Sequence, residues 1–135
     1  MPATLTFLLM DPPFESARTT SAFRLLDIAT RRGHTVNVFA YEGAVALPFA
    51  AQKAHANAVH GRTLEEERHP LPRDWVLAIM RQAAQAGGRV DWVNCGLCVD
   101  ERGVDQAVAG VRRGSPADFW KMAAASTNTL VIAAR

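Results

Sequence analysis

The two cysteines of this 135-residue chain, Cys95 and Cys98, are its strongest candidates for chemistry. They form a Cys-Gly-x-Cys pattern directly after a short β-type run at 90–93, which a glycine pair opens, and Gly103 closes the segment. A strand that ends in such a pattern places sulfur at the carboxyl edge of a sheet, where open α/β sheets bind their ligands. We therefore predict the chemical site within residues 87–103.

Thiol chemistry is the first interpretation of this pattern. A cysteine reacts as the thiolate, and a loop rich in backbone N–H groups, with a possible helix start behind it, would lower a thiol pKa. The charge of Arg102 would add to this effect, whereas Asp100 and Glu101 would oppose it. A second interpretation is a dithiol–disulfide couple, although a thioredoxin-like fold carries its motif near the first strand and here it comes late in the chain.

The sequence leaves two further interpretations of the cysteine pair open. A Cys-x-x-Cys pair supplies half of a zinc site, and His55, His60 and His69 are the available completing ligands, but their spacing matches no standard zinc knuckle. The cysteines can also be two small, buried and inert core residues.

Composition narrows the class of protein. The formal net charge of +2 is too small to argue for a nucleic-acid partner. No apolar run reaches the length of a membrane-spanning helix, and the N-terminus has no basic signal-peptide region. We therefore expect a cytoplasmic protein with no membrane partner. In a reducing compartment a close cysteine pair is more often redox-active or metal-bound than a structural disulfide.

The elements that must position the cysteines alternate between strand and helix. The patterns predict strands at 4–10, 34–40, 90–95 and 129–134, and helices at 20–32, at 73–86 and from Ser115 onward. Residues 104–111 fit either a short helix or a helix that feeds a fourth strand near 108–111. This alternation predicts one domain over residues 1–135: an α/β fold of flavodoxin or Rossmann type, with about five mainly parallel strands and helices on both faces.

Two regions point to contacts beyond the fold itself. Residues 46–72 read as a long excursion from the sheet, of the kind that forms lids or partner surfaces. The tryptophans, Phe119, Met122 and the apolar run at 44–49 amount to more apolar surface than one small sheet covers, which predicts a subunit interface. Asn94 and Gly96 flank Cys95 and are expected to shape its loop.

Three groups of residues, in this order, resemble the DsrE/DsrF/TusD family of sulfur-relay proteins. Together they cover nearly the whole chain except the excursion. They are residues 7–10 with the proline-containing loop and 21–24; residues 32–39 with 41–45; and residues 93–95, 102–104 and 110–115 with the closing strand.

The resemblance implies a function and an assembly. In TusD-like members a cysteine precedes the glycine of an Arg-Gly-Val element by eight residues, and Cys95 precedes Gly103 by the same number here. The resemblance therefore implies that Cys95 is the sulfur acceptor. It also implies that Arg102 and Gly103 belong to the Arg-Gly-Val element beside the site. Cys98 departs from the single-cysteine pattern. The resemblance further implies sulfur donor and acceptor proteins as partners, and a homo-oligomer, typically a trimer or hexamer.

Three functions follow as hypotheses. The leading one is a persulfide carrier that accepts sulfane sulfur on Cys95 and passes it to a partner thiol, without a bound cofactor. The second is a dithiol–disulfide redox protein that uses both cysteines. The third is a non-catalytic binding or assembly subunit.

Overall fold

The computed structural model describes residues 1–56, 59–67 and 70–134. Its elements follow in the order β1 (Thr4–Leu9), α1 (Ala17–Arg31), β2 (Thr35–Ala40), η1 (Glu42–Ala46, a 3₁₀ helix), α2 (Pro72–Gln85), β3 (Arg89–Cys95), α3 (Gly96–Arg102), β4 (Val111–Gly114), α4 (Pro116–Ala125) and β5 (Asn128–Ile132).

The sheet is parallel throughout. Within the described residues, five strands pair in the order β4-β3-β2-β1-β5. This confirms the predicted α/β fold class. Since all strands run the same way, their carboxyl ends share one edge. Ala40 pairs with Leu9 on one side and with Asn94 on the other, and Cys95 pairs with Gly114. The segments that follow β1 to β4 therefore begin along the same edge of the sheet as Cys95.

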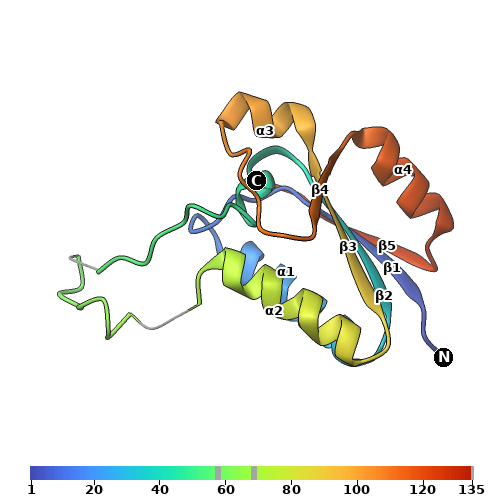
Figure 1. Ribbon diagram of the computed structural model, residues 1–135, viewed down its shortest axis with the longest axis horizontal. Helices are drawn as coiled ribbons and strands as arrows, with labels where there is room; N and C mark the ends of the chain where they lie inside the picture. Colours follow the sequence, from blue (N-terminus) through green and yellow to red (C-terminus); the bar gives the residue numbers. More distant parts are fainter. Residues whose placement is uncertain (57–58, 68–69, 135) are drawn as a thin grey trace.

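Helices cover both faces of the sheet, as predicted. In Figure 1, α1 and α2 lie side by side on one face and α4 lies on the other, while α3 sits at the carboxyl edge. The central strands are apolar on both faces because both are covered. The largest fully buried side chains include Trp92, Phe23, Phe39, Leu26, Leu47, Ile79, Val36, Val38, Val76 and Val93.

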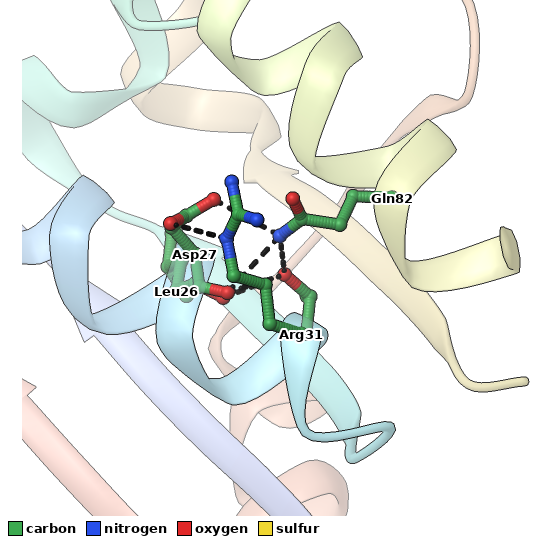
Figure 2. A network of polar contacts seen from close by, with 5 residues as sticks. Leu26, Asp27, Arg31 and Gln82 are labelled. Carbon is green, nitrogen blue, oxygen red and sulfur yellow. Dashed lines mark hydrogen bonds and ion pairs between the residues drawn. The ribbon is translucent and has the colours of Figure 1, made fainter. Parts of the chain in front are cut away.

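A polar network fixes α1 against α2 (Figure 2). The Gln82 amide donates hydrogen bonds to the Asp27 carbonyl at 3.0 Å, to the Asp27 carboxylate at 2.9 Å and to the Thr30 hydroxyl at 2.7 Å. Arg31 donates to the same carboxylate at 3.0 Å. Burial alone would raise the pKa of Asp27, but the hydrogen bonds from Arg31 and Gln82 and the charge of Arg31 outweigh it, and the pKa is lowered.

The first helix begins earlier than predicted. The helix starts at Ala17 because Ser16 is its N-cap, with its hydroxyl accepting a hydrogen bond from the Arg18 N–H at 3.2 Å. The predicted start at residue 20 is wrong, because the Ser16 cap allows the helix to begin at Ala17. The predicted stop holds: Gly33 follows the helix with a φ of 77°, a conformation that favours glycine.

The segment around the cysteines also differs from the prediction. Residues 96–102 form α3 instead of a loop, and Gly103 ends it with a φ of 65°. The fourth strand is β4, which begins at Val111 and not near residue 108. Gly110, with a φ of 95°, turns the chain just before that strand. No helix forms in residues 104–110, all of which the structure describes.

The excursion separates into a packed start and an extended part. Ala44, Val45 and Leu47 are buried in the core of their own chain, so the expectation that 44–49 forms a surface for a neighbour was wrong. The described residues that follow extend away from the sheet (Figure 1). Two backbone hydrogen bonds hold their base to the α3–β4 loop: Ala50 N–H to the Gln106 carbonyl and Val108 N–H to the Pro48 carbonyl.

The last helix and strand leave apolar side chains in solvent. Ser115 and Asp118 form a capping box at the start of α4, where a helix was predicted. Met122 is buried, whereas Phe119 is only half-buried and Trp120 is 75% exposed. On the edge strand β5, Leu130 and Val131 are exposed. Trp92, in contrast, is completely buried in the core.

Candidate functional site

Cys95 is the last residue of β3, at the carboxyl edge of the sheet. Its side chain is buried, with 2% exposed. The position of this side chain is fixed by the sheet, because Cys95 pairs with Gly114 of β4 and the preceding residue, Asn94, pairs with Ala40 of β2. The strand therefore sets the place of the Cys95 sulfur, as the sequence predicted.

Cys98 lies in the first turn of α3, so the two cysteines are on a strand end and a helix rather than in one loop. The helical turn folds Cys98 back, so that its thiol lies close enough to Cys95 for that group to affect its pKa. Both cysteines are free and buried. Burial, the interaction with the Cys95 thiol and the negative charge that Cys95 can carry raise the pKa of Cys98 above its ordinary value of 9.0. A Glu42 hydrogen bond and the charge of Arg102 oppose this rise in pKa but do not cancel it.

A backbone group of η1 completes the sulfur site. The Glu42 N–H donates to Sγ of Cys98 at 3.2 Å. Glu42 has a φ of 50°, in the left-handed region that glycine favours. Gly43 beside it does not adopt a positive φ. Gly43 has another constraint: a Cβ there would lie 2.8 Å from Pro12 of the β1–α1 loop. The sequence analysis missed Glu42, since no pattern distinguishes it from a residue that merely ends a strand.

Asn94 holds η1 against β3. Its amide donates to the Val45 carbonyl at 3.1 Å, and its oxygen accepts from the Trp92 indole N–H at the same distance. Asn94 is 3% exposed and both ends of its side chain are bonded, so its position is fixed. The residue predicted to shape the cysteine loop thus lies beside Cys95 and fixes the neighbouring η1.

Two arginines flank α3. Arg102 donates to the Cys98 carbonyl at 3.3 Å and pairs with Glu101 at 3.5 Å, so it lies next to Cys98 and not over Cys95. Arg113 of β4 makes a two-point pair with Asp100, at 2.8 and 2.5 Å. The hydrogen bonds of this pair lower the pKa of the Asp100 carboxyl. The sequence analysis included Arg113 only within the resembling segment 110–115, because its place beside Cys95 depends on the register between β3 and β4.

The family model for the DsrE/DsrF-like family matches residues 3–132 of this chain. The chain belongs to the DsrE/DsrF-like family. Its fold is similar to that in the crystal structure of the YchN protein from E. coli, with a TM-score of 0.73 and 16% sequence identity over 98% of this chain and 100% of that one. A search of curated proteins found no match.

The DsrE/DsrF-like fold here carries no cluster of metal ligands in the residues that the structure describes. His55 makes an edge contact with the Phe14 ring, at 6.3 Å between centroids. His69, one of the proposed zinc ligands, lies outside the described residues. Within the described part of the chain, no helix combines the length and apolar character that crossing a bilayer requires.

Proposed function

We propose that this DsrE/DsrF-like protein is a persulfide carrier, with Cys95 as the sulfur acceptor. The observation that carries the proposal is the position of Cys95 at the carboxyl end of β3, on the edge that the carboxyl ends of the parallel strands share. The Cys95 thiolate attacks the outer sulfur of a donor persulfide. A new S–S bond forms on Cys95, the S–S bond of the donor breaks, and the donor leaves as a thiolate. A partner thiol then repeats the exchange on loaded Cys95.

The environment of Cys98 disfavours that thiol as the nucleophile. Thiol exchange proceeds through the thiolate. Because its pKa is raised, Cys98 is a neutral thiol at pH 7. A neutral Cys98 beside Cys95 can donate a hydrogen bond to sulfur on Cys95 without adding a second negative charge.

Intact-mass measurement after incubation with inorganic polysulfide tests this function. We expect the wild-type protein to gain one or more sulfur atoms and to lose them on treatment with a reductant. Cys95→Ser should show no gain, while the matched variant Cys98→Ser should keep it. Equal loading of Cys95→Ser would reject Cys95 as the acceptor.

A dithiol–disulfide couple is the second candidate, favoured by the position of Cys98 in the first turn of the helix that follows Cys95. In this reaction the Cys98 thiolate attacks the inner sulfur of the Cys95 persulfide. The Cys95–Cys98 disulfide forms, the S–S bond of the persulfide breaks and the outer sulfur leaves as hydrosulfide. This chemistry would make the protein a releaser of sulfide instead of a carrier.

The proposal includes assembly with like subunits in the cytoplasm, as a trimer or hexamer with Cys95 near a subunit boundary. The exposed apolar side chains of Trp120, Leu130 and Val131 support an interface on α4 and β5. Light scattering at micromolar concentration tests the assembly, and a monomer mass would reject it. Sulfur donor and acceptor proteins remain the proposed partners.

A further inference from the structure

The Arg113 guanidinium lies against the residue that follows Cys95. In the sheet, Arg113 is paired with Asn94, and the next pair is Gly114 with Cys95. The side chain reaches over the carboxyl edge to Gly96, where an added Cβ would lie only 2.6 Å from the Arg113 Nε. The absence of a side chain at Gly96 therefore allows a positive charge to sit at the first residue of α3, next to Cys95.

The present partner of Arg113 holds it weakly. Both side chains of the Arg113–Asp100 pair are more than half exposed, and exposed ion pairs are weak because water screens the two charges. Arg113 also lines a hollow of about 100 Å³ together with Val99 and Val104. The side chain thus has room to change rotamer without displacing packed neighbours, and a competing anion near Gly96 can draw the guanidinium away from Asp100.

The neighbouring arginines, Arg112 and Arg102, are bonded to groups other than Gly96 and Cys95. Arg112 makes a two-point pair with Asp91 at 2.9 and 3.0 Å and lies 3.8 Å from Asp118. Arg102 is bonded to the Cys98 carbonyl and to Glu101. In the described segment from 100 to 114, Arg113 is therefore the arginine whose charge lies against the residue following Cys95.

We infer that Arg113 holds the anionic sulfur that is brought to Cys95, and that Asp100 competes with this sulfur for the guanidinium. The inference rests on the proposed persulfide function. A persulfide or polysulfide arrives as an anion, and an anionic leaving group forms as its S–S bond breaks, so a nearby guanidinium stabilises both states. The raised pKa of Arg113, caused first by its hydrogen bonds to Asp100 and to a smaller extent by the charges of Cys95 and Asp105, agrees with this placement.

The first test measures the rate of sulfur loading from inorganic polysulfide, in a Cys98→Ser background so that only Cys95 reacts. Arg113→Gln should slow loading about tenfold, as expected for loss of one charge several ångströms from the reacting atoms. Asp100→Asn should accelerate loading, because the guanidinium loses its competitor. Arg112→Gln is the matched control and should leave the rate unchanged. If Arg113→Gln and Asp100→Asn slow loading equally, the pair is structural and the inference is wrong.

The second test separates this inference from the sulfur chemistry. In the same background, Cys95 is alkylated with anionic iodoacetate and with neutral iodoacetamide, and the ratio of the two rates is compared among variants. The ratio should fall about tenfold in Arg113→Gln, recover in Arg113→Lys and rise in Asp100→Asn. An unchanged ratio in Arg113→Gln overturns the inference even if Cys95 accepts sulfur. A changed ratio without sulfur loading rejects the carrier function but retains Arg113 as the anion-holding residue.

Discussion

The backbone N–H of Glu42 donates a hydrogen bond to Sγ of Cys98 across 3.2 Å, joining the end of β2 to the first turn of α3. Glu42 reaches this position in a left-handed conformation, with a φ of 50°. Residues in that region are strained unless they are glycine, and strained residues gather at functional sites because the surrounding structure must hold them there. Here the left-handed conformation of Glu42 directs its backbone N–H toward the thiol of Cys98.

Replacement of Glu42 tests whether its backbone is strained. Glu42→Gly should raise the free energy of unfolding by about 1 kcal/mol, because glycine adopts a positive φ without the steric penalty. The neighbouring substitution Gly43→Ala should lower it by about 1–3 kcal/mol, since its Cβ would lie 2.8 Å from Pro12. Urea denaturation midpoints at constant slope measure both effects. Loss of stability in Glu42→Gly would show that its side chain, and not its backbone, matters.

The raised pKa of Cys98 predicts how its reactivity changes with pH. In a Cys95→Ala background, where one cause of the rise is removed, Cys98 should be alkylated by iodoacetamide with a lower apparent pKa than Cys98 of the wild type. In the wild type, Cys98 should react slowly at pH 7 and faster only above pH 9.0, its ordinary value. Peptide mapping distinguishes the two cysteines. Rapid labelling of wild-type Cys98 at pH 7 would contradict the assignment of a neutral thiol.

Much of the fold was predictable because the strongest patterns were local. The apolar runs of β1, β2 and β3, and the glycines after the helices, predicted the parallel sheet and the edge on which Cys95 lies. The Cys-x-x-Cys spacing allowed a dithiol couple as one interpretation, but the bounds of the helix that brings Cys98 close to Cys95 were not predictable, because α3 has only seven residues and shows no apolar periodicity. Glu42 and Arg113 act through positions that only the register between strands and the packing of loops create.

The network between α1 and α2 predicts a contribution to stability from Gln82. Gln82→Ala removes three hydrogen-bond contacts to α1 and should lower the free energy of unfolding by about 1–3 kcal/mol, because partly buried acceptors lose their donor. Gln85→Ala, an exposed glutamine on the same helix, is the matched control and should change stability by less than about 0.5 kcal/mol. Equal effects in the two variants would mean that helix propensity, and not the network, determines the change.

The same network makes the free energy of unfolding depend on pH. The pKa of Asp27 is lowered in the folded protein, so the folded state binds this proton less readily than the unfolded chain. The stabilising contribution is therefore complete above the ordinary value of 3.8 and is lost as the pH falls through the lower folded value. Asp27→Asn should flatten the fall in stability below pH 3.8 relative to wild type, measured by urea denaturation from pH 6 to pH 2.5. An unchanged slope would assign the acid sensitivity to other carboxylates.

The proximity of the two thiols predicts the fate of a persulfide on Cys95. If Cys98 is a resolving thiol, loaded wild-type protein should release hydrosulfide and form an internal disulfide, whereas loaded Cys98→Ser should keep its sulfur. Because Cys98 must lose its proton to attack and its pKa is raised, release should be slow at pH 7 and accelerate as the pH rises toward and beyond 9.0. Sulfide is measured colorimetrically, and the disulfide by the mass change on reduction and alkylation. Equal release rates from wild type and Cys98→Ser across this pH range would mean that Cys98 takes no part in resolution, and the protein would then retain its sulfur until a partner thiol removes it.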